Sequence, residues 1–311
     1  MSSNHLFLGS EYAQRPRDEA TFHIIPVPYE HTVSYGAGTA HGPQAILEAS
    51  DQLEVFDGTS SPGDEGIHTS PAVECTGGPS VVFPRITAAV TTAVREGPGG
   101  RGIPIVLGGE HSISAPAVRG VRDSMGEPIG VVQIDAHADL RNQYEGTPES
   151  HASVARRIHQ DLQLPLIQIG VRALSPEEVL YRAEVATRAG TDPTYPAITT
   201  FDAPSIVPTG ISSITVPKSF PQRVYVTIDV DGLDPSIIPA TGTPVPGGLA
   251  WYQFLSIIDS IASQREIVGC DVVELAPIPG QHGWDYAAAE VVYRTMGIIA
   301  RSTPSRERHR S

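Results

Sequence analysis

The 311-residue chain has little lysine, little cysteine and no long uninterrupted apolar segment. Lys218 is its only lysine and lies in a loop-like stretch, which argues against Schiff-base chemistry and a Walker-type phosphate loop. Cys75 and Cys270 have neither CxxC spacing nor the density of a disulfide scaffold, and this favours a reducing compartment. Because no signal peptide or membrane span is apparent either, we expect a cytoplasmic protein with no membrane partner.

Basic residues are also fewer than acidic ones. The chain has 21 Lys and Arg against 35 Asp and Glu, which gives a formal net charge of −14. This charge opposes binding to nucleic acid and to anionic membranes, and it favours small cationic partners through long-range attraction. The Gly-x-Ser-x-Gly elbow of serine hydrolases and the His-Glu-x-x-His helix of zincins are also absent. With 40% hydrophobic and 18% charged residues, the composition is that of a globular protein.

Short apolar runs alternate with segments of helical spacing along most of the chain. The apolar runs predict buried strands at 22–28, 103–107, 130–134, 164–170, 223–230 and 267–275. The helical spacing predicts helices at 45–53, 86–96, 115–122, 152–162, 176–188, 251–262 and 286–300. Such alternation predicts an α/β fold with a mostly parallel sheet, helices on both faces and ligand sites at the carboxyl ends of strands.

No internal repeat and no linker divides the sequence, so we expect a single domain over residues 1–311. Gly, Pro and Ser are concentrated in residues 58–79 and 203–219, which predicts surface loops there. The Arg-rich residues 301–311 are expected to form a disordered tail.

Three of the predicted strands end in segments rich in metal-binding side chains. The segments are GGEHS at 108–112, DAHAD at 135–139 and DVDGLDP at 229–235. Alternate residues of an extended segment point to the same side, so the polar residues of DAHAD face one way with small alanines between them. The first two Asp of DVDGLDP are related in the same way. The candidate metal ligands are His111, Asp135, His137, Asp139, Asp229 and Asp231.

Taken singly, any one of these carboxylates could cap the loop that follows its strand. Four of them together at apolar strand ends would suffer desolvation and mutual repulsion unless cations were present. No cluster of Lys or Arg lies nearby in the sequence to neutralise them. Two imidazoles and four carboxylates without a thiolate match two Mn²⁺ ions, whereas a single Zn²⁺ ion would leave three donors unused. A pair of such ions ionises a shared water, which predicts hydrolysis.

In this order, the three segments resemble the ureohydrolases, the family of arginase and agmatinase. The resemblance extends over residues 22–300. Flanking segments bring it closer to agmatinases: IPVPY at 25–29, SYGAGT at 34–39, GPQAI at 42–46, GVR at 170–172, TGTP at 241–244 and GGL at 247–249. The resemblance implies an arginase-like three-layer α/β/α fold with about eight strands in the central sheet. It also implies a homo-oligomer, either a trimer or a hexamer.

The resemblance further assigns roles to individual residues. It implies two Mn²⁺ ions per subunit, one bound by His111 and Asp139, the other by His137 and Asp231, and both bridged by Asp135 and Asp229. Asp139 would also orient the hydroxide. Glu274 matches the carboxylate that binds the guanidinium, a planar cation whose donor fork pairs well with a carboxylate. His151 matches the histidine that binds substrate and shuttles the proton to the departing amine, and Thr243 lies in a matching substrate-binding segment.

The expected reaction is therefore the hydrolysis of agmatine, a small cationic guanidino substrate, to putrescine and urea. A ureohydrolase for 4-guanidinobutyrate or guanidinopropionate stays open, because the far end of the pocket decides between an ammonium and a carboxylate tail. The net negative charge of the chain favours the cation. Residues 140–146 lack the Thr, Asn and Ser set with which arginases hold an α-amino acid, so arginase is less favoured. A non-catalytic metal-binding scaffold predicts the loss of His151 or Glu274, and both are present.

Overall fold

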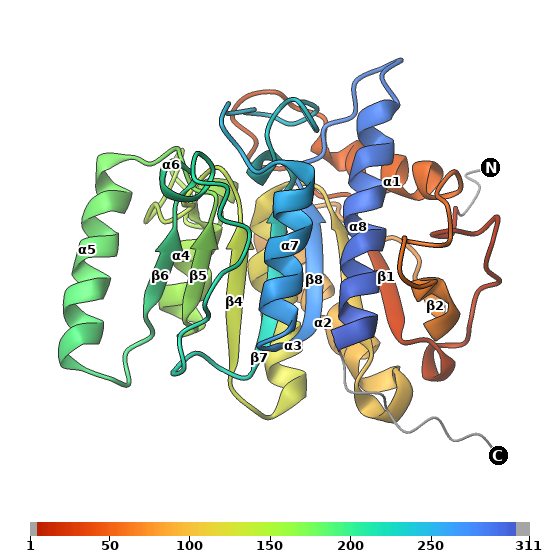
Figure 1. Cartoon of the computed structure of the whole chain (residues 1–311), viewed down its shortest axis with the longest axis horizontal. Coiled ribbons are helices and arrows are strands. Elements are labelled where there is room, and N and C mark those ends of the chain that lie inside the picture. The colour runs from red at the N-terminus through yellow and green to blue at the C-terminus, as the bar shows by residue number, and fades with distance from the viewer. Residues whose placement is uncertain (1–4, 303–311) are drawn as a thin grey trace.

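The computed structural model describes residues 5–302 of the chain. It contains one eight-stranded sheet in the order β2-β1-β3-β8-β7-β4-β5-β6, and every strand pair in it is parallel. The strands are β1 (Phe22–Val27), β2 (Ile67–Thr69), β3 (Ile103–Gly108), β4 (Ile129–Ile134), β5 (Leu166–Ile169), β6 (Ile198–Phe201), β7 (Arg223–Asp229) and β8 (Glu266–Val273). The predicted α/β class and the parallel sheet of about eight strands are confirmed (Figure 1).

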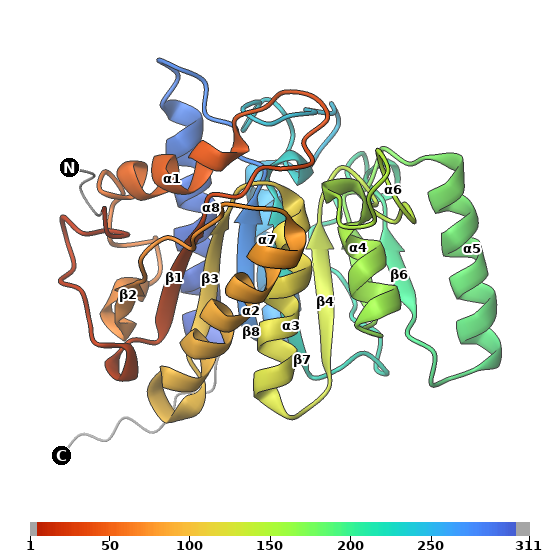
Figure 2. The same cartoon turned by 180° about the vertical axis from the view of Figure 1, so that it is seen from behind.

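Helices cover both faces of the sheet. They are α1 (Gly42–Ser50), α2 (Pro79–Glu96), α3 (Ser114–Met125), α4 (Val154–Arg156), α5 (Pro176–Thr191), α6 (Ala203–Ile206), α7 (Trp251–Ala262) and α8 (Gly283–Ser302). Figure 1 shows α7 and α8 in front of the sheet, and Figure 2 shows α2, α3 and α4 on the opposite face, which confirms the three layers. Among the described residues, no helix combines the length and the apolarity needed to cross a bilayer.

The central strands are apolar along their whole length because both of their faces are covered. In β4, Val132 and Ile134 pack into the core cluster shared with α1, α7 and α8. The alternate residues Ile129 and Val131 pack into the other cluster, shared with α2 and α3. This period of two on a doubly covered strand explains why the sequence shows continuous apolar runs rather than alternation.

Two of the predicted loops are wrong in part. The segment 58–79 contains β2, and 203–219 begins with α6. Strand β6 was also outside the predicted strands. Because β2 has three residues and β6 is an edge strand without a buried residue, neither has the apolar run of an interior strand. Of the predicted tail, Arg301 and Ser302 belong to α8, and residues 303–311 lie outside the described residues.

The strand order brings four strand ends together at one edge. Strands β3, β8, β7 and β4 are consecutive neighbours in the sheet. Neighbouring strands lie about 4.8 Å apart, so their carboxyl ends form one short row. The chain leaves β3, crosses to β4, and later fills the space between them with β7 and β8. Ligand sites of open α/β sheets form at such changes of direction in the strand order.

Gly109 holds the segment after β3 against the segment after β1. Its N–H donates to the Val27 carbonyl at 2.9 Å, and a Cβ at this position would lie 2.0 Å from the Tyr29 carbonyl oxygen. Only glycine allows this close approach of two backbones. The contact fixes the position of the residues that follow each of the two strands.

We predict that Gly109→Ala lowers the free energy of unfolding by about 1–3 kcal/mol or more, because the two backbones must move apart. The matched control is Gly190→Ala in α5, where an added Cβ meets no atom within 4 Å. Alanine there should raise the free energy of unfolding by up to about 1 kcal/mol. Urea unfolding of both variants measures this, and a wild-type midpoint for Gly109→Ala contradicts the prediction.

Candidate metal centre

The six predicted metal ligands lie together at the carboxyl edge of β3, β7 and β4. His111 begins a short helical turn after β3, Asp135 directly follows β4, and Asp229 is the last residue of β7. The structure places all six side chains in contact with at least one other member of the set: His111, Asp135, His137, Asp139, Asp229 and Asp231. The strand order therefore brings together the donors that the sequence carries in three separate segments.

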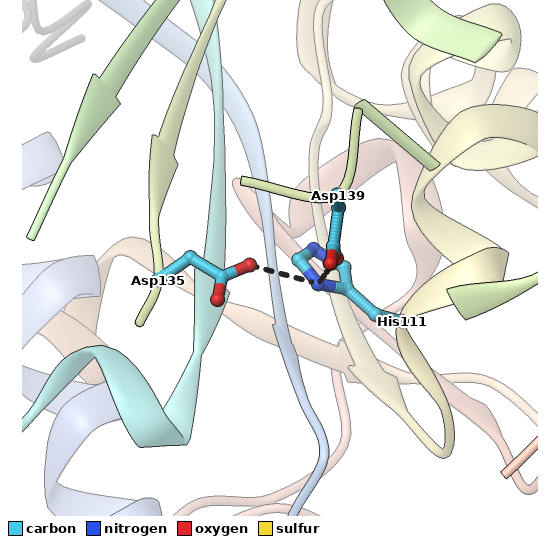
Figure 3. A group of neighbouring side chains, drawn as sticks. All are labelled: His111, Asp135 and Asp139. Atoms are coloured by element: carbon cyan, nitrogen blue, oxygen red, sulfur yellow. Dashed lines mark ion pairs between the residues drawn. The ribbon is translucent and has the colours of Figure 1, made fainter. Parts of the chain in front are cut away.

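Three carboxylates surround the first histidine. Nδ1 of His111 lies 3.0 Å from Asp139 Oδ2, 3.2 Å from Asp135 Oδ2 and 3.4 Å from Asp229 Oδ2. Figure 3 shows Asp135 and Asp139 approaching the imidazole from two directions. Nδ1 makes no hydrogen bond within the part of the chain that the structure describes. The oxygens are thus close to Nδ1 without being aligned with it, as expected for atoms directed at a common point.

A second group of donors adjoins the first. Nδ1 of His137 lies 3.0 Å from Asp231 Oδ2 and 3.7 Å from Asp135 Oδ1. Asp135 therefore directs one oxygen toward each histidine and belongs to both groups. Nitrogen and oxygen donors of this kind, with one shared carboxylate, fit two neighbouring divalent cations.

The pKa shifts of the cluster show the cost of burying several carboxylates together. Burial and the charge of Asp135 raise the pKa of Asp139 to about 7. Burial also raises the pKa of Asp229 well above its usual value. Burial alone would lower the pKa of His137, but hydrogen bonds with Asp135 and Asp231 outweigh it and raise that pKa to about 12. Without cations the cluster holds extra protons, and divalent ions would replace them.

Two residues of the site have backbone conformations that favour glycine. The φ angles are +51° at Asp139 and +65° at Glu274. Such left-handed conformations cost of order 1–3 kcal/mol at a non-glycine residue and are typical of functional sites. Both side chains line a small cavity beside the cluster.

Buried polar residues behind the cluster orient the ligands, and the sequence reading missed them. Gln133 donates from Nε2 to Asp135 Oδ2 at 2.8 Å. Thr227 Oγ1 lies 2.9 Å from Nε2 of His111 and donates to Asp271 Oδ1 at 2.6 Å. Gln133 and Thr227 each precede an aspartate by two residues in a strand. The period of two was therefore a usable signal, because it places both residues on the same side as the ligand.

Arg172 lies close to the cluster, although the sequence shows no basic cluster near the aspartates. Nη2 of Arg172 donates to the Asp231 carbonyl at 2.7 Å and also to the carbonyl of Val245. It binds backbone oxygens and so fixes the loop that carries Asp231. Among the described residues it makes no ion pair with these carboxylates, although its charge interacts with Asp231, Asp135 and Asp229.

A cavity of about 160 Å³ opens beside the cluster. Its lining includes the three further residues that the resemblance singled out, namely His151, Thr243 and Glu274. Glu274 follows β8, accepts a hydrogen bond from the His111 N–H at 2.6 Å, and has a pKa that burial raises to about 8. Arg141 and Tyr144 also line the cavity. Larger cavities of about 910 and 770 Å³ occur elsewhere, but none of the six donors lines them.

Residues 20–297 match the family model of the arginase family. The chain belongs to the arginase family. An N(1)-aminopropylagmatine ureohydrolase from Synechocystis sp. is 38% identical over 300 residues, which cover 95% of this chain and 94% of that relative. An agmatinase from Pyrococcus horikoshii is 31% identical, with 91% of this chain and 93% of the relative covered. Like these relatives, this arginase-family chain is a hydrolase.

The fold of this arginase-family hydrolase agrees with solved structures. The agmatine ureohydrolase of Thermoplasma volcanium superposes with a TM-score of 0.76 at 27% identity, covering 97% of this chain and 96% of that one. Arginase from Medicago truncatula superposes with a TM-score of 0.72 at 27% identity, covering 90% and 88%. The arginase-like fold implied by the sequence resemblance is confirmed.

We predict that Asp135→Asn weakens metal binding by about 100-fold or more, because Asp135 belongs to both donor groups. The matched control is Asp234→Asn, from the same DVDGLDP segment. Asp234 accepts hydrogen bonds from the backbone of Gly247 and Gly248 and lies outside both groups. Equilibrium dialysis against Mn²⁺ followed by elemental analysis measures the bound ions. Equal retention of metal by the two variants contradicts the prediction.

We also predict that the metal-free protein loses stability as the pH rises from about 5 to about 9. The folded-state pKa values of Asp139, Glu274 and His137 are raised, to about 7, 8 and 12. Groups with raised pKa values stabilise the folded state at low pH, and this stabilisation is lost as the pH rises toward the folded value. The two nearby imidazoles lower the pKa of Asp135 despite its burial, so its contribution changes only in acid.

The measurement is the thermal unfolding midpoint with EDTA and with Mn²⁺ at several pH values. The increase caused by Mn²⁺ should grow with pH, because the ions compete with protons for the same donors. An increase that is the same at pH 6 and pH 8.5 contradicts the assignment of these groups as ligands.

Proposed function

We propose that this chain is a binuclear manganese amidinohydrolase that cleaves a cationic guanidinoalkylamine to urea and an amine. Agmatine, which gives putrescine, and its N1-aminopropyl derivative are the substrates we favour. The observation that carries the proposal is the pair of His/Asp groups sharing Asp135, with Glu274 and His151 in the same small cavity. The names of the relatives from Synechocystis and Pyrococcus support the choice of substrate.

The six ligands would hold the two ions in the arrangement that the resemblance implies. When bound, the ions supply a water that is ionised near neutral pH. A bound guanidinium favours the ionised form of Glu274, whose carboxylate binds the planar cation by parallel hydrogen bonds and orients its carbon toward the cluster. Asp139 accepts the proton that the attacking water gives up.

His151 completes the reaction by protonating the departing amine nitrogen. Amines leave poorly as anions, so C–N cleavage needs a proton donor beside the nitrogen. His151 lines the cavity, and its imidazole titrates in a range suited to the task. Burial lowers its pKa, which favours release of the proton to the more basic amine. Thr243 lines the same cavity and completes the substrate-binding set.

One observation favours a second candidate function. Arg141 lines the cavity, with its guanidinium 5.1 Å from the centre of the Tyr144 ring. An arginine at this place would pair with a carboxylate tail and repel an ammonium. A ureohydrolase for a guanidino acid such as 4-guanidinobutyrate is therefore the alternative. The homo-oligomeric state and the cytoplasmic location stay predictions of the sequence.

Urea release from a panel of substrates tests the proposed function. Mn²⁺-loaded protein is given agmatine, N1-aminopropylagmatine, arginine and 4-guanidinobutyrate, and kcat/KM is measured for each. We expect at least one of the two guanidinoalkylamines to exceed the other two compounds by about tenfold or more. A tenfold preference for 4-guanidinobutyrate establishes the second candidate instead, and no urea from any compound refutes both.

The variant Arg141→Met removes the positive charge while keeping a long side chain. If the tail is an ammonium, this variant should retain or improve kcat/KM for agmatine, because a repulsion is removed. If the tail is a carboxylate, kcat/KM for 4-guanidinobutyrate should fall by about tenfold or more, because a charged partner is lost.

A further inference from the structure

Three distant segments of the chain meet at the hydroxyl group of Thr32. Thr32 lies in the loop after β1, Glu110 is the second residue after β3, and His151 begins a short helical turn before α4. Thr32 and Glu110 are separated by 78 residues, and Thr32 and His151 by 119. Neither Thr32 nor Glu110 has a place in the reaction described above.

The contacts of Thr32 use the full hydrogen-bonding capacity of a hydroxyl group. Oγ1 donates to Glu110 Oε1 at 2.9 Å. It accepts from the backbone N–H of His151 at 3.1 Å, and it lies 3.2 Å from Nδ1 of the same histidine. A hydroxyl has one donor and two acceptor sites. With the donor used by Glu110, the contact at Nδ1 must use an acceptor site.

The carboxylate of Glu110 fixes the orientation of the Thr32 O–H bond. Its side chain is fully buried and is surrounded by donors. The backbone N–H groups of His31 and Thr32 donate to Oε2 at 2.5 and 2.6 Å, and the hydroxyl of Ser112 lies 2.5 Å from Oε1. A carboxylate can only accept, so the hydrogen of Thr32 points to Glu110 and a lone pair of Oγ1 points to His151.

We propose that Thr32 is the residue that positions His151, by keeping Nδ1 protonated and leaving Nε2 free for the substrate. The inference rests on the proposed function. Among the described residues, both hydrogen-bonding contacts of the ring are at Nδ1, and the contact with Ser150 Oγ, at 3.5 Å, is the longer one. The edge-on packing of Tyr144, with ring centres 5.8 Å apart, limits rotation of the imidazole.

This arrangement gives His151 one defined path for the proton. The neutral ring carries its hydrogen on Nδ1 and takes up the proton of the attacking water on Nε2 by way of Asp139. When the C–N bond of the substrate breaks, its electron pair stays on the amine nitrogen, which takes the proton from Nε2. The ring returns to its starting form with Nδ1 still bonded to Thr32. With the opposite tautomer, Nε2 could not accept the first proton.

A double-mutant cycle with agmatine as substrate tests whether Thr32 acts through His151. The variants are Thr32→Val, which removes the hydroxyl at nearly constant shape, His151→Asn, and the double variant. We expect Thr32→Val to lower kcat by about 10- to 100-fold with KM changed less than about threefold, since substrate contacts remain. In the His151→Asn background the same change should cost less than about twofold. Thr32→Ser, which restores the hydroxyl, should recover most of kcat.

Two results overturn the inference. An equal loss in both backgrounds means that Thr32 acts independently of His151. A Thr32→Ser variant as slow as Thr32→Val means that the hydroxyl is not what matters.

Crystal structures of the Mn²⁺-loaded wild type and Thr32→Val provide a test that does not need activity. We expect the His151 ring to keep one orientation in the wild type and to change or lose it in Thr32→Val. An unchanged ring refutes the positioning role. If the wild type releases no urea from any guanidino compound, the proposed function fails, while the ring orientations still decide the role of Thr32.

Discussion

The structure depends on the electrostatic problem of four aspartates buried at one edge of a parallel sheet. Their carboxylates lie within a few ångströms of two imidazoles. Burial raises the pKa values of Asp139 and Asp229, which means that keeping these two carboxylates ionised inside the protein costs free energy. Two divalent cations would resolve this repulsion and provide a hydrolytic centre at the same time. The proposed metal centre and the proposed reaction both follow from that requirement.

The strand order is the means by which the fold creates this edge. Because β8 and β7 fill the space between β3 and β4, residues far apart in the chain become neighbours at the carboxyl ends of four adjacent strands. Glu274 reaches the cavity from β8, between the strands that carry the metal ligands. A single row of strand ends thus supplies both the metal centre and the group proposed to bind the guanidinium.

The sequence predicts the parts of the site that are local and periodic. DAHAD has its donors at alternate positions after a buried strand, so its common face follows from the period of a strand. The interior strands were predicted for a similar reason, since burial on both faces makes them continuously apolar. The edge strands β2 and β6 were missed, because their short, partly polar sequences lack that signal. The contact of Thr32 with Glu110 and His151 was also missed, since it joins loops that only the folded chain brings together.

Electron paramagnetic resonance of the Mn²⁺-loaded protein tests the central claim most directly. If the two donor groups share Asp135 as described, two bound ions about 3.5–4 Å apart should give the spectrum of a magnetically coupled pair. The spectrum of isolated Mn²⁺ at a stoichiometry of one ion per chain would contradict the account.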